Sequence, residues 1–314
     1  MYLRLVFENL QNKIGDDFMG NSHLNDPRKK FYAEKFPDQE QNTPALQSKM
    51  NPKPDCGEES YKGYNRLEGR NALITGGDSG IGRAAAIAYA REGANVAIQF
   101  FPGEEEDANE VKELIEEAGR KALLLPYDLR EDGTATEIVT KTVEAFGGLD
   151  TLVLNAAQQI AQPTLGDLTM KQVHDTFKVN IISMFETVKA AEQHLKPGSA
   201  IITTTSVLSF NPTTPLMDYA ATKGAISNFT INLSAYFSSK GVRVNGVAPG
   251  PIWTPLQLDN GQLAGQLPQF GQNTPLGRAG QPAELAPVYV LLASDEGSYI
   301  TGQIYGVTGG EAIN

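Results

Sequence analysis

The sequence contains a single cysteine, Cys56, among its 314 residues. One thiol cannot form an internal disulfide, and it cannot by itself build a thiolate metal site. We therefore expect Cys56 to be a bystander in an irregular segment, and we expect no metal in the functional site.

Basic residues and long apolar runs are also scarce. Lys and Arg number 26 against 37 Asp and Glu, which gives a net charge of −11. A nucleic-acid-binding surface needs a basic patch, so the composition argues against a nucleic-acid partner. No apolar run approaches the ~20 residues that cross a bilayer. The start of the chain is interrupted by charge at Arg4, too early for a secretory signal. We expect a cytoplasmic protein without a membrane partner.

The composition of the chain is that of a folded globular domain, and an irregular N-terminal arm precedes this domain. Hydrophobic residues make up 40% and charged residues 20% of the chain, as in ordinary globular proteins. Residues 1–66 differ, because Pro-containing polar segments such as 35–44 and 51–55 show neither helical nor alternating periodicity. They predict an extended N-terminal arm, partly disordered and partly laid over the main domain. The sequence leaves open whether residues 1–18 are an extension upstream of Met19.

From Arg70 onward, short apolar runs alternate with amphipathic helical segments, which predicts a doubly wound parallel sheet with helices on both faces. Right-handed crossovers limit the order of seven strands, and we expect 3-2-1-4-5-6-7. The expected strands are 71–75, 96–100, 122–126, 151–154, 200–205, 242–247 and 303–307. The expected helices are 81–92, 104–118, 134–146, 170–194, 216–239 and 282–293.

The first strand-to-helix turn is rich in glycine, from Gly76 to Gly82. Glycines let the backbone approach a pyrophosphate at a helix N-terminus, where free N–H groups favour anions. The spacing is Gly-x-x-x-Gly-x-Gly, a variant of the usual dinucleotide fingerprint. The alternative is that these glycines serve only a tight turn.

Tyr219 and Lys223 lie four residues apart, which places them on one face of a helix. A fixed positive charge beside a phenol lowers its pKa from about 10 toward the range where it can transfer protons. The same spacing also occurs by chance on amphipathic helices.

Together, Thr75-Gly-x-x-x-Gly-Ile-Gly82 and Tyr219-x-x-x-Lys223 resemble the short-chain dehydrogenase/reductase family, in consistent order from about Leu67 to the C-terminus. The resemblance is to a bacterial oxidoreductase with an extended N-terminal arm. It implies one Rossmann-fold domain over residues 67–314, including a substrate lid at about 254–277.

The resemblance implies roles for four residues. Tyr219 would donate or accept the proton, Ser206 would bind the substrate carbonyl oxygen, and Asn180 would hold a water near Lys223. Lys223 would lower the phenol pKa and bind the nicotinamide ribose. Taken singly, each could also be only a polar residue on an α/β scaffold.

The resemblance also implies NAD or NADP as the cofactor. Phe100 and Phe101 stand where an acidic residue would favour NAD or an Arg would favour NADP, so the preference stays open. Ala157 replaces a glycine usual in the family. The expected cofactor-binding residues are Gly76, Asp78, Ser79, Gly80, Ile81, Gly82, Phe100, Asp128, Leu129, Asn155, Ala156, Tyr219, Lys223, Pro249, Gly250, Ile252 and Thr254.

We therefore expect an NAD(P)-dependent oxidoreductase acting on CH–OH groups, with a small aldehyde, ketone or sugar-like alcohol as substrate. The segment 255–271 suits a mobile lid, and Leu208, Phe210, Met217 and Trp253 could form apolar walls or only core packing. Family members pair through the two long helices, which implies a homotetramer. The alternative is a dinucleotide-binding regulatory or stress-associated protein with little or no turnover.

Overall fold

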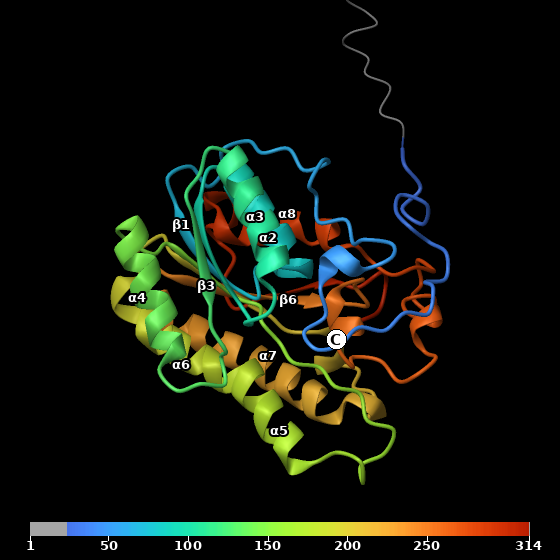
Figure 1. Cartoon of the computed structure of the whole chain (residues 1–314). Helices are drawn as coiled ribbons and strands as arrows, with labels where there is room; N and C mark the ends of the chain where they lie inside the picture. The colour runs from blue at the N-terminus through green and yellow to red at the C-terminus, as the bar shows by residue number, and fades with distance from the viewer. Residues whose placement is uncertain (1–23, 314) are drawn as a thin grey trace, which may run out of the picture.

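The computed structural model describes residues 24–313 (Figure 1). Two expectations fall outside this range: that residues 1–18 could be an extension upstream of Met19, and that the arm is partly disordered before residue 24. Within it, no helix combines the length and apolar character needed to cross a bilayer. Nor do three His, Cys, Asp or Glu side chains of this range gather closely enough to hold a metal ion.

The core is one seven-stranded sheet in which every neighbouring pair is parallel. The strand order is β3-β2-β1-β4-β5-β6-β7, which confirms the predicted order. The central strands are buried along most of their length, as expected for a parallel sheet covered on both faces. The strands are β1 (Asn71–Thr75), β2 (Asn95–Phe100), β3 (Ala122–Pro126), β4 (Thr151–Leu154), β5 (Ala200–Thr204), β6 (Arg243–Pro249) and β7 (Ile304–Val307).

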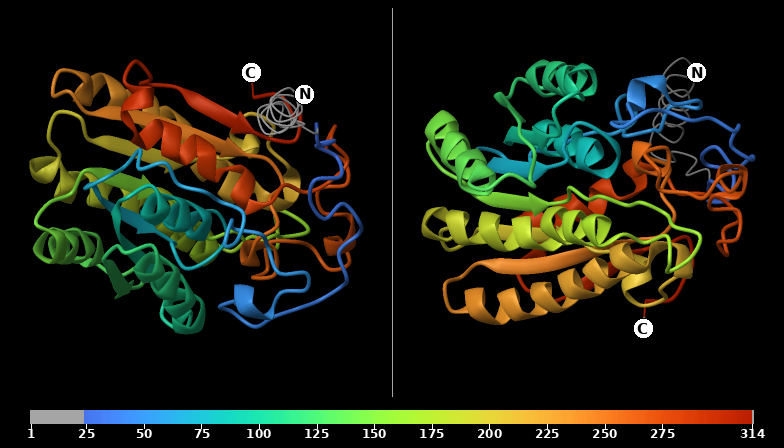
Figure 2. Two further views of the ribbon diagram at one scale, coloured as in Figure 1. Left: turned by 90° about the horizontal axis from the view of Figure 1, so that it is seen from above. Right: turned by 60° about the horizontal axis from the view of Figure 1, so that its bottom comes forward.

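Helices cover both faces of the sheet (Figures 1 and 2). Alternation along the strands assigns the faces: Ile74 and Ile98 belong to one apolar cluster, and Leu73 and Ala97 belong to the other. The first cluster packs on α2 (Gly80–Arg91), α3 (Glu105–Glu117) and α8 (Ala286–Ala293). The second packs on α4 (Thr134–Phe146), α6 (Ser183–Ala191) and α7 (Met217–Ser238), with α5 (Met170–Phe177) continuing that layer.

Two predicted helices differ from the structure. The helix expected over 170–194 is interrupted by one wide π-helical turn, Lys178–Ile182, and ends in a 3-10 turn, Glu192–His194. The helix expected from residue 282 begins with a 3-10 turn, Pro282–Glu284, before α8. Pro287 explains the second difference, because it has no N–H to donate and is tolerated only in the first turn of a helix.

The arm comprises residues 24–66. Its first part lies beside the lid (the dark blue and orange segments of Figure 1), and its last part runs past α2, where Tyr61 Oη donates to Glu92 Oε1 at 2.7 Å. The ring of Phe36 stacks on Trp253, with centroids 3.7 Å apart and planes 7° apart. The indole N–H of Trp253 donates to the Pro52 carbonyl at 2.8 Å. The arm, the lid and the residues on either side of the lid thus share a third apolar cluster, which contains Phe36, Ala45, Met50, Trp253, Leu258, Leu267 and Ala279.

Candidate active site

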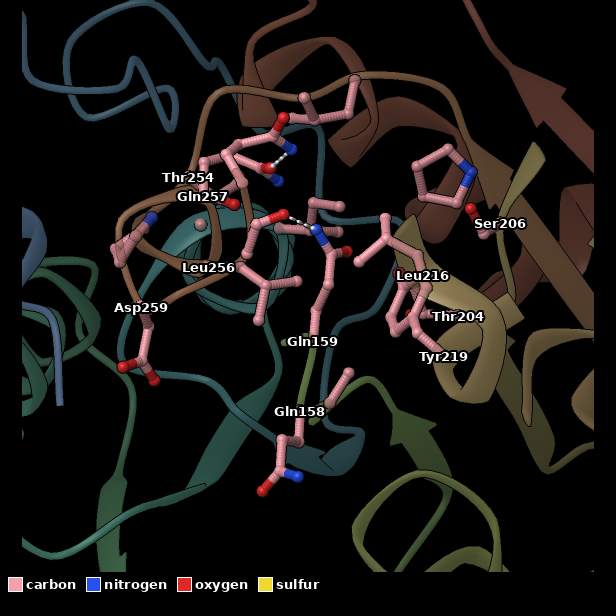
Figure 3. A pocket seen from close by; sticks show the side chains of 18 of the residues that line it. Gln158, Gln159, Thr204, Ser206, Leu216, Tyr219, Thr254, Leu256, Gln257 and Asp259 are labelled. Atoms are coloured by element: carbon pink, nitrogen blue, oxygen red, sulfur yellow. Dashed lines mark hydrogen bonds between the residues drawn. The ribbon is translucent and has the colours of Figure 1, made fainter. Parts of the chain in front are cut away.

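A cavity of about 810 Å³ opens at the carboxyl ends of the strands, where ligands bind in open α/β sheets. Its wall combines the glycine turn, the ends of β4 to β6, the start of α7, the lid and part of the arm. In Figure 3, Ser206 and Tyr219 lie on one side, Gln257 and Asp259 lie on the other, and Gln159 stands between them. A volume of this size suits a cofactor together with a small substrate.

The glycine turn has a backbone that other residues could not adopt. Gly76 and Gly80 have φ angles of 62° and 52°, in the left-handed region that favours glycine. A Cβ on Gly82 would lie 1.8 Å from the Gly76 carbonyl oxygen. The turn therefore holds the start of α2 close to the cavity floor, and its geometry fits a pyrophosphate at the helix N-terminus.

Asn155 fixes this turn from the neighbouring strand. Its Nδ2 donates to the carbonyls of Thr75 at 3.2 Å and Gly76 at 3.0 Å, and its Oδ1 accepts from Thr204 Oγ1 at 3.1 Å. The side chain thereby joins the ends of β1, β4 and β5. Ala157, the departure from the family pattern, lines the cavity beside it.

Ser206, Tyr219 and Lys223 face the cavity together. The Lys223 ammonium lies 5.2 Å from the centre of the Tyr219 ring and donates to the Thr204 carbonyl at 2.8 Å. Both side chains are almost fully buried. The spacing of four residues on α7 thus gives the predicted juxtaposition of phenol and amine.

Burial shifts the proton affinities of this pair in opposite senses. It raises the pKa of Tyr219, and the neighbouring Ser206 hydroxyl opposes that rise as a hydrogen-bond partner. It lowers the pKa of Lys223 to about 7. Near neutral pH part of the Lys223 population is therefore unprotonated. Burial thus reduces the fraction of molecules in which Lys223 carries the positive charge expected to lower the phenol pKa.

Asn180 lies behind the cavity wall and does not line it. It occupies the π-helical turn, a feature often found at functional sites. Its Oδ1 accepts from the Gln158 amide at 2.7 Å, and its Nδ2 donates to the Gln158 carbonyl at 2.9 Å and to Thr222 Oγ1 at 3.1 Å. Its side chain thus ties the loop after β4 to α7.

Asp218, beside Tyr219, is a buried residue whose contacts the sequence did not predict. Its Oδ2 accepts from Gln172 Nε2 at 3.1 Å and from Thr176 Oγ1 at 2.8 Å. These bonds hold the start of α7 against α5, so that the face of α7 that carries Tyr219 has a fixed orientation.

Two further expectations need correction. The Phe100 side chain belongs to the core and does not line the cavity, because alternation along β2 sends it to the same face as Ile98. Phe101, the next residue, lines the cavity instead, and the Arg130 guanidinium lies 5.2 Å from the centre of its ring. Gly82 also lies outside the lining, beneath Gly76. The other expected cofactor-binding residues all line the cavity.

The end of the cavity near β2 carries two carboxyl groups, of which Asp78 is buried and Glu104 is half-buried. Burial raises the pKa of Asp78, and the Asp107 charge adds to that rise. Burial also raises the pKa of Glu104, with repulsion from Asp78 as the next cause. Asp128 lines the same end and is paired with Arg130 at 2.7 Å.

The rest of the cavity is lined by amide side chains together with apolar ones such as Leu256, Leu263 and Phe270. Gln159 Nε2 donates to the Gly261 carbonyl at 2.8 Å, and Gln262 Nε2 donates to Gln257 Oε1 at 2.8 Å (dashed lines in Figure 3). Of the four candidate apolar walls, only Leu208 lines the cavity, while Trp253 is buried beneath the arm. The amide side chains of the wall include Gln158, Gln159, Asn211, Gln257, Gln262, Gln266, Gln269 and Asn273.

Comparison with known proteins gives matches over most of the chain. A family model described as "Enoyl-(Acyl carrier protein) reductase" matches residues 76–311. The uncharacterized oxidoreductases YhxD of Bacillus subtilis and YghA of Escherichia coli are 56% and 55% identical, each over 93% of this chain and 99% of their own. The glucose and ribitol dehydrogenase of Daucus carota is 43% identical, over 89% of this chain and 98% of its own.

Among solved structures, a short chain dehydrogenase from Burkholderia cenocepacia in complex with NADP superposes with a TM-score of 0.73. It is 33% identical, and the match covers 78% of this chain and 99% of that one.

Proposed function

Because the chain belongs to the short-chain dehydrogenase/reductase family, we propose that it is an NAD(P)-dependent oxidoreductase that interconverts a carbonyl and an alcohol. The observation that carries this proposal is that Ser206, Tyr219 and Lys223 face one cavity with the glycine turn. The bound dinucleotide supplies or accepts the hydride at its nicotinamide ring.

Each of the three side chains has a separate task in this proposal. In the direction of reduction, the Tyr219 hydroxyl gives its proton to the developing alkoxide. The Ser206 hydroxyl donates a hydrogen bond to the same oxygen and stabilises its charge. Lys223, whose pKa burial lowers to about 7, binds the ribose and can return a proton to the phenolate near neutral pH.

The dinucleotide fits the residues present. The glycine turn and the N-terminus of α2 can hold the pyrophosphate, and Asp128 and Leu129 can hold the adenine. Pro249, Gly250, Ile252 and Thr254 can hold the nicotinamide. The superposable Burkholderia protein carries NADP, which supports a dinucleotide in this cavity.

We propose a polyhydroxylated substrate, in the class of sugars and sugar alcohols. Amide side chains can both donate to and accept from hydroxyl groups. Several of them line the cavity, and Gln257 lies on the side opposite Ser206 and Tyr219. The carrot relative is named for glucose and ribitol. Among the lining residues, the cations are Arg130, paired with Asp128, and Lys223, at the catalytic end. The cavity thus offers no basic patch for an acidic carrier protein.

Substitution of Tyr219 by Phe tests the mechanism, with turnover followed by dinucleotide absorbance on glucose, ribitol and simple aldehydes. We expect Tyr219→Phe to lose about 10³-fold in kcat, as for the loss of a general acid, while its dinucleotide Kd stays unchanged. Tyr299→Phe, at a fully exposed position, is the matched control and should keep wild-type turnover.

Substantial turnover by Tyr219→Phe would refute the proposed chemistry. If the wild-type protein binds a dinucleotide but turns over none of these substrates, the alternative of a binding protein with little activity is favoured. Exclusive turnover of carrier-bound thioesters would refute the proposed substrate class.

A further inference from the structure

The arm enters the cavity at the end that carries Asp78 and Phe101. Thr43, Pro44 and Ala45 line the wall there. In dinucleotide-binding sheets the adenosine ribose lies at the end of the second strand, beyond the phosphate turn. The arm therefore lies at the adenosine half of the site assigned above, and the inference developed here rests on that proposed function.

Gln47 links the arm to the glycine turn. It is buried, at 2% exposed, and its Oε1 accepts from the Gly80 amide at 2.8 Å. Ser79, the residue that precedes α2, makes no side-chain capping bond. The first N–H groups of a helix have no intrahelical partner. Gln47 thus supplies the cap that Ser79 does not, and Ile81, the next residue of this first turn, lines the cavity where an anion would bind.

A buried carboxylate holds this segment in place. Asp107, on the first turn of α3, is 0% exposed. Its Oδ2 accepts from the Gln47 amide at 2.5 Å, and its Oδ1 accepts from the Ser48 amide at 2.9 Å. One carboxylate thus fixes two consecutive arm amides, so that the position of the Gln47 side chain is set by α3 and not by the arm alone.

The other end of the segment reaches the lid. Thr43 Oγ1 donates to Asp259 Oδ1, and Asn260 Nδ2 donates to Thr43 Oγ1 at 3.3 Å. Between these ends, Pro44 packs on the loop after β2, where a Cβ on Gly103 would lie 3.1 Å from Pro44 Cγ. Residues 43–48 therefore span from the phosphate turn to the lid across one wall of the cavity.

We propose that residues 43–48 of the arm are a built part of the adenosine half of the dinucleotide site, with Gln47 as a positioning residue. Gln47 holds Gly80 so that the first turn of α2 keeps the orientation needed for the pyrophosphate. Thr43, Pro44 and Ala45 close the wall beside the adenosine. The dinucleotide site thus combines the arm, near the start of the described residues, with the sheet domain that follows it.

The test measures the binding of the adenosine half and of the nicotinamide half of the cofactor separately. Gln47→Met keeps the side-chain length but removes the acceptor for the Gly80 amide. Asn42→Ala, at an exposed position of the same arm, is the matched control. Calorimetric titrations of the full chain measure the Kd for NADH, NADPH, ADP-ribose and nicotinamide mononucleotide.

We expect Gln47→Met to weaken ADP-ribose and the preferred dinucleotide about tenfold, as for a hydrogen bond whose buried donor is left unpaired. Its Kd for nicotinamide mononucleotide should equal that of the wild type, and Asn42→Ala should bind all four ligands normally. Unchanged ADP-ribose affinity in Gln47→Met, or equal weakening of both fragments, would overturn the proposal, since general loosening would not spare one half.

Hydrogen exchange of the wild-type protein gives a second measurement, should Gln47→Met fail to fold. ADP-ribose should slow amide exchange in residues 43–50, whereas nicotinamide mononucleotide should not. If the amide exchange rate of residues 43–50 does not change when ADP-ribose is added, the proposal is overturned. If the wild type binds no dinucleotide at all, the proposed function falls and this inference falls with it; wild-type binding with normal Gln47→Met affinities removes only the inference.

Discussion

Replacement of Phe36 by Ala should release the arm without unfolding the sheet. Phe36 is 2% exposed and its ring lies flat on Trp253. Truncation of a buried Phe to Ala typically costs about 3–5 kcal/mol, from the lost burial and the cavity left behind. Phe36 belongs to the small cluster shared by arm and lid and not to the two clusters of the sheet. The loss should therefore appear as local opening of the arm.

The magnitude converts directly into an exchange rate. At about 1.4 kcal/mol per factor of ten, a loss of 3 kcal/mol raises the open population on the order of 10²-fold. Hydrogen exchange with mass spectrometry can follow the Lys49 and Met50 amides, which donate to Leu46 and Gln47 carbonyls. Amides of β5 serve as the internal reference, because they report opening of the sheet.

Two comparisons make the prediction refutable. Tyr64→Ala removes an aromatic ring from the same arm at a position that is 76% exposed, and it should change exchange little. If Phe36→Ala leaves arm exchange at the wild-type rate, the stack on Trp253 does not hold the arm. If β5 exchange accelerates as much as the arm does, the arm is not a separately docked segment.

Two further predictions concern titration and assembly. Because the folded-state pKa of Lys223 is lowered from 10.5 to about 7, the unfolded chain binds more protons between these values, and stability should rise with pH across that interval. Lys223→Met should flatten this rise in thermal melts, and an unchanged slope would contradict it. We also expect a homotetramer built through exposed apolar side chains of α6 and α7, among them Phe185 and Ile231, each more than half exposed. Light scattering should give four times the 33.9 kDa chain mass, with a smaller mass for Phe185→Glu, and a monomeric wild type would refute the assembly.

The strand order could be predicted from the sequence because it depends on local patterns. Each strand is a short apolar run followed by a helical segment, and right-handed crossovers leave few arrangements. Residues such as Ile74 and Leu73 carry the alternation that sends neighbours to opposite faces. The pairing of Tyr219 with Lys223 was predictable for the same reason, since four residues make about one helical turn.

The arm's contribution could not be predicted, because its contacts join distant parts of the chain. Phe36 meets Trp253 more than 200 residues away, and Gln47 meets Gly80 across 33 residues. A segment without periodicity carries no local signal for such partners. The Phe100 side chain was misplaced for a different reason: one residue of register decides whether a strand end faces core or cavity.

The π-helical turn at Lys178–Ile182 constrains how this gene can change in length. A π-turn holds one more residue than an α-helical turn, so deleting one residue there would restore a regular α-helix and leave α5 and α6 nearly in their present orientation. A deletion of one residue within α5 or α6 would instead turn the two helices against each other by about 100°. Either Thr176 would then leave Asp218, or Met184 would leave the apolar cluster beneath α6. The Lys178–Ile182 turn is therefore the place in this helical stretch where the loss of one residue would disturb the packing of its neighbours least.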